Sequence, residues 1–116
     1  MNCSVIITNN EKGVCDAPLI YKNQAKADQV FIFHVISTIE EATQKRYFPD
    51  YITKFAKIKK TDLSAETIIR MDLEEEFLKF MTENYSCTYD YDLKYFLLRS
   101  GHKRIEISMY TVPTGD

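Results

Sequence analysis

The residues of this chain best suited to binding a ligand are the basic ones in segment 43–60. Asp50 is the one acidic residue there against six basic residues. The six are Lys45, Arg46, Lys54, Lys57, Lys59 and Lys60. Such a cluster can neutralise phosphates, although a solvated helix face is its commoner meaning. We name Lys54, Lys57 and Lys60 as candidate nucleic-acid contacts, while the pI near 5.7 argues against a dedicated nucleic-acid-binding protein.

The segment that follows, 62–83, has the opposite charge. It contains seven acidic residues against Arg70 and Lys79. Glu74 and Glu75 stand in its acidic run, where carboxylates near a helix start would complement the helix dipole. The same carboxylates could meet a basic surface of a partner protein. Glu74 and Glu75 are therefore candidate protein contacts.

Asp90 and Asp92 form a third candidate pair. They are two residues apart in a segment of strand-like alternation, so we predict that they share one strand face. Two carboxylates could begin a metal site, but the sequence defines no third ligand. We predict no metal and no cofactor, and we keep both aspartates as candidate contacts with a partner.

Sequence motifs of the common enzyme classes are missing. The chain has no GxSxG, P-loop, GxGxxG or HExxH pattern, and neither His34 nor His102 has a neighbouring Ser or Cys in a nucleophile motif. Cys3, Cys15 and Cys87 form no CxxC pair, and their odd number favours a reducing compartment. The chain shows no signal-peptide pattern and no apolar run of membrane-spanning length. We expect a cytoplasmic protein without catalytic residues.

The C-terminal segment from 87 to 112 is typical of an aromatic β-hairpin. Five apolar residues alternate there with Thr88, Asp90, Asp92, Lys94 and Phe96: Tyr89, Tyr91, Leu93, Tyr95 and Leu97. An odd-length loop centred on Gly101 would pair Leu97 with Ile105 and Tyr95 with Ile107, which separates the apolar and charged faces. The aromatic face is then predicted to be the floor of the core. A base-stacking platform is its weaker interpretation.

The middle of the chain predicts two or three helices. Residues 24–46 carry an amphipathic stripe, which favours one long helix, and a strand at 30–36 followed by a short helix is the alternative. Asp50 and Ser64 are the predicted caps of the next two helices. An alternative for the third helix is a short strand at 66–71 followed by a new helix that Asp72 caps.

The N-terminal segment predicts a second hairpin, with strands at 3–8 and 14–21 around a turn at 9–13. Pro18 would confine the second strand to an edge or interrupt it. The predicted fold is α+β: an antiparallel sheet from the N-terminal and C-terminal β-hairpins, packed against two or three central helices. We expect residues 1–116 to form a single compact domain, because the length suits one hydrophobic core and the 45% hydrophobic and 28% charged residues are near the average for globular domains.

These features give three functional hypotheses. The leading one is a small non-catalytic protein-binding module that modulates a partner protein as an inhibitor or adaptor, because the charge is segregated and tyrosine is abundant. The alternative is a nucleic-acid-binding protein that uses the basic segment 45–60. The third is an enzyme whose groups converge only in the fold. Another protein is the expected partner, a homodimer through a free hairpin edge is a second option, and no membrane contact is expected.

Overall fold

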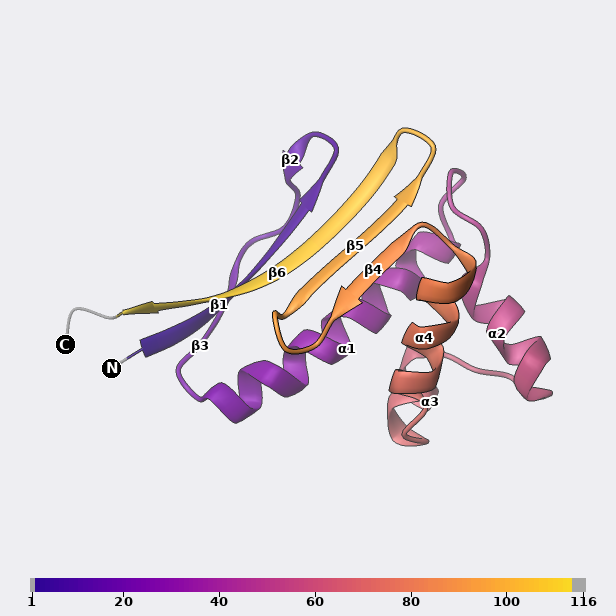
Figure 1. Cartoon of the computed structure of the whole chain (residues 1–116), viewed down its shortest axis with the longest axis horizontal. Helices are drawn as coiled ribbons and strands as arrows, with labels where there is room; N and C mark the ends of the chain where they lie inside the picture. Colours follow the sequence, from indigo (N-terminus) through magenta and orange to yellow (C-terminus); the bar gives the residue numbers. More distant parts are fainter. Residues whose placement is uncertain (1, 114–116) are drawn as a thin grey trace.

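The computed structural model describes residues 2–113 and confirms the predicted α+β class, with six antiparallel strands and four helices (Figure 1). The strands are β1 (Asn2–Asn10), β2 (Gly13–Val14), β3 (Leu19–Tyr21), β4 (Cys87–Asp90), β5 (Tyr95–Ser100) and β6 (Lys103–Pro113). The helices are α1 (Gln24–Thr43), α2 (Tyr51–Lys59), α3 (Ala65–Arg70) and α4 (Glu74–Asn84).

The two ends of the described chain meet in the middle of the sheet. Strands β1 and β6 are antiparallel neighbours from Asn2 opposite Pro113 to Asn10 opposite Ile105. The order of strands is β2-β1-β6-β5-β4, and β3 pairs with β1 beside β2. Pro18 lies between β2 and β3 and interrupts the returning strand. Both predicted hairpins therefore belong to one sheet.

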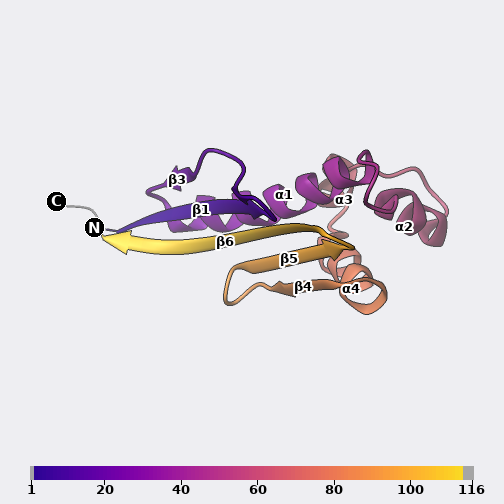
Figure 2. The same cartoon turned by 90° about the horizontal axis from the view of Figure 1, so that it is seen from above.

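The helices all lie on one side of the sheet (Figures 1 and 2). Helix α1 runs along the face of β1, β6 and β5, and α2, α3 and α4 gather near its C-terminal end. The core between these layers is formed by residues with no more than 1% exposure, among them Ile6, Phe31, Val35, Ile39, Phe96 and Ile107. Within residues 2–113, no helix combines the length and apolar character needed to span a bilayer.

Helix α1 is continuous, which confirms the favoured prediction of one long helix. The alternative prediction of a strand at 30–36 is wrong. Helix α1 begins after Asn23, whose side-chain oxygen accepts a hydrogen bond from the Lys26 amide. Its stripe of Phe31, Val35 and Ile39 is buried against the sheet. This burial outweighs the strand preference of the β-branched residues in the segment, because propensity is the weaker term once a face is packed.

The shorter helices confirm two predicted caps and correct a third. Asp50 accepts a hydrogen bond from the Thr53 amide at 3.0 Å, and Ser64 accepts one from the Thr67 amide at 3.2 Å. Residues 66–71 are not a strand, because α3 occupies Ala65–Arg70. Asp72 is not the cap of the next helix, since it lies in the turn after α3 with a left-handed φ of 54° and Leu73 stands between it and α4. Helix α4 starts after Leu73 without a side-chain cap, which brings the number of helices to four.

Aromatic side chains join α2 to α4. The Phe55 and Phe77 ring centroids lie 5.1 Å apart in an edge-on arrangement, and those of Tyr51 and Tyr85 lie 4.7 Å apart. The ring centroid of Phe80, also on α4, lies 5.4 Å from that of Phe55. Such edge-to-face pairs add to the stabilisation that burial provides. The aromatic cluster therefore anchors α2 to α4.

The predicted register of the C-terminal hairpin is wrong. Ser100 pairs with Lys103 across a two-residue turn, so Phe96 lies opposite Ile107 and Leu98 lies opposite Ile105. These last four residues are buried in the core. Leu97 and Tyr95 instead lie on the face away from the helices, whereas Ile105 and Ile107, which were predicted to share their face, are buried in the core.

The cause of the error is a turn inside the segment that looked like one strand. Strand β4 ends at Asp90, and β5 starts only at Tyr95. Lys94 closes the turn with a left-handed φ of 52°. Because side chains alternate only within a continuous strand, the turn moves the apolar pattern onto the other face.

Candidate functional site

The predicted basic contacts lie on and after α2. Lys54 and Lys57 are exposed on this helix, and Lys60 follows its last residue with a left-handed φ of 57°. Lys57 and Lys60 border a shallow pocket of about 480 Å³ together with Asp62. Lys54 lies apart from that pocket, with its Nζ 5.6 Å from the Tyr85 ring centroid. The structure therefore does not gather these lysines into one phosphate site.

Glu74 and Glu75 border a pocket of about 290 Å³ between α1, α4 and β4. Tyr89 and Tyr91 form its aromatic wall. The Oε2 atom of Glu74 is buried without a hydrogen-bond partner among the described residues, whereas Glu75 is exposed. Carboxylates beside aromatic rings suit a cationic side chain. Their role in binding stays a prediction.

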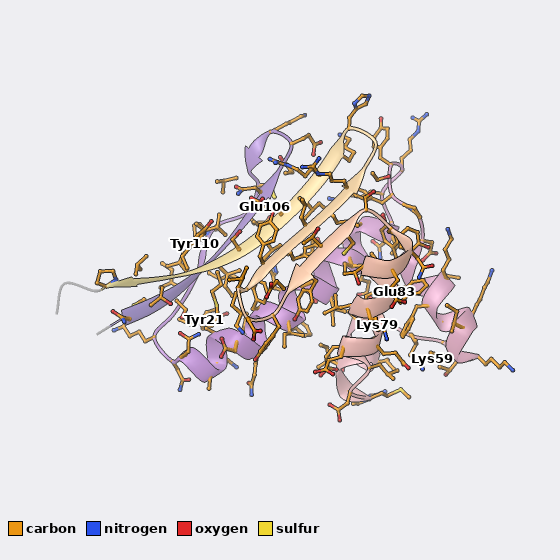
Figure 3. The ribbon with its side chains drawn as sticks, viewed as in Figure 1. Tyr21, Lys59, Lys79, Glu83, Glu106 and Tyr110 are labelled. Atoms are coloured by element: carbon orange, nitrogen blue, oxygen red, sulfur yellow. The ribbon has the colours of Figure 1, made fainter. Side chains whose placement is uncertain are left out.

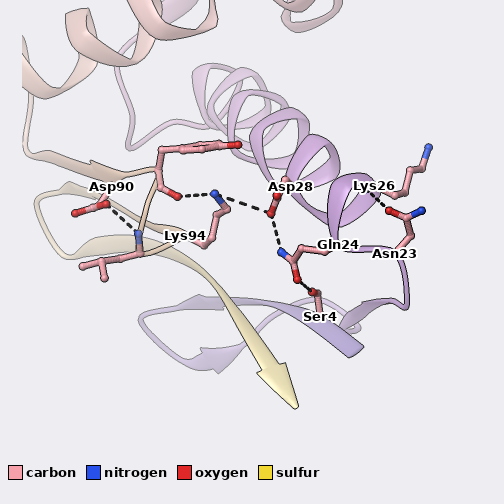
Figure 4. A network of polar contacts seen from close by, with 9 residues as sticks. Ser4, Asn23, Gln24, Lys26, Asp28, Asp90 and Lys94 are labelled. Carbon is pink, nitrogen blue, oxygen red and sulfur yellow. Dashed lines mark hydrogen bonds and ion pairs between the residues drawn. The ribbon is translucent and has the colours of Figure 1, made fainter. Parts of the chain in front are cut away.

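The prediction that Asp90 and Asp92 share a strand face is wrong. Asp90 ends β4, where its side chain accepts a hydrogen bond from the Leu93 amide at 3.0 Å, and Asp92 lies in the turn that follows. Lys94 binds this turn to α1, since its Nζ donates to the Tyr91 carbonyl and lies 3.9 Å from Asp28 (Figure 4). No group of three metal-ligating side chains occurs among residues 2–113.

His34 lies half-buried where α1 crosses β1. Its Nε2 is 2.7 Å from the Thr8 hydroxyl, and burial lowers its pKa. The Cys15 thiol donates to the Thr8 carbonyl at 3.6 Å, and burial together with the Asp16 charge raises the pKa of that thiol. An activated nucleophile needs a lowered thiol pKa. This arrangement therefore supports a structural role for His34 and Cys15.

The lowered pKa of His34 makes folding stability depend on pH. Its folded-state pKa lies below the ordinary 6.5, so the unfolded chain binds the proton first as the pH falls. The free energy of unfolding should therefore decline as the pH drops from about 7.5 to about 5.5. We expect His34→Gln to reduce that decline in urea titrations. Equal pH dependence in the wild type and His34→Gln would contradict this expectation.

The face of the sheet opposite the helices carries an exposed apolar row. Val5 of β1 pairs with Ile20 of β3 on one side and with Tyr110 of β6 on the other. Ile20 is 65% exposed and Tyr110 is 54% exposed, with Val112 nearby at 40%. Residues directly opposite in a sheet share a face, so these side chains form one continuous patch, which we call the open-face patch. It comprises Val5, Ile20, Tyr110 and Val112.

The carboxylate of Glu106 on β6 lies on the same face of the sheet, and two hydrogen bonds hold it in place. Glu106 accepts a hydrogen bond from the Tyr95 hydroxyl at 2.7 Å and one from the Asn9 amide nitrogen at 3.3 Å. The bond to Glu106 raises the pKa of Tyr95. Figure 3 shows Glu106 and Tyr110 along β6, away from Lys59, Lys79 and Glu83 on the helices. The open-face patch therefore has a polar border set by three strands.

A basic pocket lies at the end of the sheet where the β1–β2 turn and the β5–β6 turn meet the α1–α2 connection. It has a volume of about 410 Å³. Five cationic residues line it: Lys12, Lys45, Arg46, Lys103 and Arg104. Glu11 is the one acidic residue in its lining, and Tyr47 and Phe48 supply aromatic surface. We call this group the turn pocket.

Sequence reasoning missed the turn pocket because its residues come from three distant segments. Lys45 and Arg46 were assigned to a cluster with the α2 lysines, yet they face Lys103 and Arg104 instead. One signal was present, since Gly13 and Gly101 both mark turns with neighbouring cations. Pairing of β1 with β6 places Asn10 opposite Ile105 and so brings the two turns together.

Known proteins offer no further guide to function. No protein-family model, no curated protein and no solved structure matches the chain. Function therefore has to be inferred from the surfaces described above.

Proposed function

We propose that this chain is a small non-catalytic protein-binding module that modulates a partner protein as an inhibitor or adaptor. The observation that carries the proposal is the open-face patch, where Ile20, Val5 and Tyr110 form a row across three strands. An antiparallel sheet with one buried face usually presents polar residues on the other. Large apolar side chains on that second face are the common mark of an interaction surface.

The composition of the patch suits protein recognition. Tyr110 offers a large amphipathic side chain at 54% exposure, and tyrosine is enriched among the residues that dominate binding energy. Burying apolar surface against a partner contributes about 25 cal/mol per Å². The hydrogen-bonded Glu106, Asn9 and Tyr95 supply the polar border that surrounds the apolar centre of most interfaces. A protein with a complementary apolar surface is the proposed occupant.

The proposed location is the cytoplasm. Cys3, Cys15 and Cys87 are all free thiols in the structure. Cys3 and Cys15 both lie in the N-terminal hairpin region without forming a disulfide. Free thiols suit a reducing compartment, which supports this part of the proposal.

Site-specific photocrosslinking tests the proposed partner surface. We expect a photoreactive phenylalanine analogue at position 110 to crosslink one discrete protein in the cells that express the chain. The matched control is position 47, where Tyr47 is 57% exposed on a different surface. With the captured protein purified, calorimetry should show that Tyr110→Ser weakens binding by about tenfold or more, which corresponds to about 1.4 kcal/mol.

Two results would overturn the proposal. One is equal crosslinking to the same proteins from positions 110 and 47, since that would indicate nonspecific contact. The other is a stable dimer in light scattering that Tyr110→Ser dissociates, because a second copy would then be the occupant of the patch. An effect on the partner's activity that Tyr110→Ser abolishes would support the modulating role.

A further inference from the structure

We propose that the turn pocket binds a nucleotide unit, with its phosphate held by the basic side chains and its base stacked on Tyr47. This site is separate from the open-face patch and does not depend on the function proposed above. The ligand chemistry is one phosphate next to one aromatic ring. A free nucleotide and a nucleotide within a single strand share this chemistry.

The charge of the pocket is the first support. Within residues 2–113, no carboxylate comes within ion-pair distance of Lys12, Lys45, Arg46 or Arg104. Lys103 is the exception, because its Nζ lies 3.0 Å from Glu11. Five cations against one carboxylate leave a strong local excess of positive charge, although the whole chain has a net charge of -2. Concentrated positive charge in a concave site is the electrostatic signature of a phosphate ligand.

Glu11 shows where an anion sits. One of its oxygens contacts the Lys103 ammonium, and the other accepts a hydrogen bond from the backbone amide of Arg104 at 3.2 Å. Hydrogen bonds from its own backbone and from Lys103 and Arg104 lower the pKa of Glu11 to about 2. The carboxylate therefore stays ionised and occupies donors that a phosphate oxygen could share.

Tyr47 is the second support, because it supplies a stacking surface at the same place. It is 57% exposed, yet its position is fixed by the Ser100 hydroxyl, which donates to its carbonyl at 2.5 Å. The Lys103 Nζ lies 4.9 Å from its ring centroid, and the Arg46 guanidinium carbon lies 6.0 Å from it. Proteins that bind single strands combine basic side chains that contact the phosphates with aromatic rings that stack the bases, and Tyr47 with its neighbouring cations offers both groups.

The size of the pocket fits this ligand. Its volume of about 410 Å³ lies in the range of small-molecule sites, roughly 300–1,000 Å³. The lining comes from three segments that the sheet and α1 hold together, so the site does not require a folding step on binding. The predicted α2 lysines Lys54, Lys57 and Lys60 are absent from this lining.

Binding of defined probes tests the proposal. We would measure fluorescence anisotropy of a labelled single-stranded oligodeoxythymidine decamer, and calorimetry with adenosine 5′-monophosphate, ribose 5-phosphate and inorganic phosphate. Tyr47→Ser should weaken binding of the base-containing probes by roughly 5- to 150-fold, as loss of one base stack does. Tyr110→Ser is the matched control and should leave the affinity for these probes unchanged, since Tyr110 has nearly the same exposure as Tyr47 but lies on the open-face patch.

Charge variants add a second readout. Lys103→Gln and Arg104→Gln should each weaken binding and reduce the slope of log affinity against log salt by about 0.7 for the decamer. Glu11→Gln should strengthen binding by about two- to fivefold, because it releases Lys103 from its ion pair. A variant that gains affinity cannot be explained by misfolding, so Glu11→Gln keeps the test decisive.

The probes also identify the source of the nucleotide. Equal affinity for the mononucleotide and the decamer would identify a free nucleotide as the ligand of the pocket. Selective binding of the decamer would identify a nucleotide within a single strand as the ligand. The proposal is overturned if no base-containing probe binds, or if inorganic phosphate and ribose 5-phosphate bind as tightly as the nucleotide. It is also overturned if Tyr47→Ser and Tyr110→Ser have equal effects. None of these outcomes bears on the partner protein at the open-face patch.

Discussion

Replacing Phe96 with alanine is expected to lower the free energy of unfolding by about 3–5 kcal/mol. Phe96 lies on β5 with no exposed surface, opposite Ile107 and in the core cluster that includes Phe31 of α1. Its removal loses the transfer free energy of the ring and leaves a cavity in the middle of the core. For a domain of this size that is a large part of the total stability. Urea titration followed by circular dichroism measures the change.

Leu97→Ala is the matched control for this expectation. Leu97 is the next residue of β5, but it is only half-buried and lies opposite Glu106 on the uncovered face. Its truncation should cost about 1 kcal/mol or less. A larger loss for Leu97→Ala than for Phe96→Ala would restore the register with an odd loop around Gly101. The pair therefore measures which face of the hairpin is buried.

Much of the fold could be predicted because its signals are local. The amphipathic stripe of α1 extends over several turns, so the pattern outweighs the strand composition of residues 30–36. Asp50 and Ser64 could be recognised as caps because a cap depends on an amide only three residues away. The two hairpins are local as well, which is why the α+β class could be predicted.

The register of the C-terminal hairpin could not be predicted because it depends on one turn. Asp90 and Lys94 bound that turn, but the alternation of Tyr89, Tyr91, Leu93 and Tyr95 continues through it unbroken. Lys94 adopts a left-handed φ that favours glycine or asparagine, so its residue type gave no sign of a turn. The displaced turn moved Tyr95 and Leu97 of β5 to the outer face and put Phe96 in the core.

The candidate surfaces could not be predicted for a related reason. Segment charge placed Lys45 with Lys57, whereas the strand pairing of β1 and β6 places it with Lys103. The open-face patch depends on which of Tyr110 and Met109 faces the helices, and that follows from register alone. Both surfaces are formed by residues from distant segments of the chain. The periodicity of a sequence gives information only about residues that are close along the chain.

Thr38→Pro should lower the free energy of unfolding by about 3 kcal/mol or more. Thr38 lies in the interior of α1, so proline removes one intrahelical hydrogen bond and its ring clashes with the carbonyl four residues earlier. If residues 30–36 were a strand and Ser37 capped a new helix, Thr38 would instead be the first helical residue, where proline is favoured. The substitution therefore has opposite consequences in the two folds.

The control for this substitution is proline at Gln24, the first residue of α1. Asn23 before it is already extended, at φ -92° and ψ 116°, as a residue preceding proline prefers. Gln24 also accepts a hydrogen bond from Ser4 and donates one to Asp28, so Gln24→Ala is the proper reference for Gln24→Pro. Urea titration should find these two variants within about 1 kcal/mol of each other, because the first helical amide has no intrahelical acceptor to lose. A Thr38→Pro variant as stable as the wild type would disprove a continuous α1, and with it the packing of Phe31, Val35 and Ile39 that holds both candidate surfaces in place.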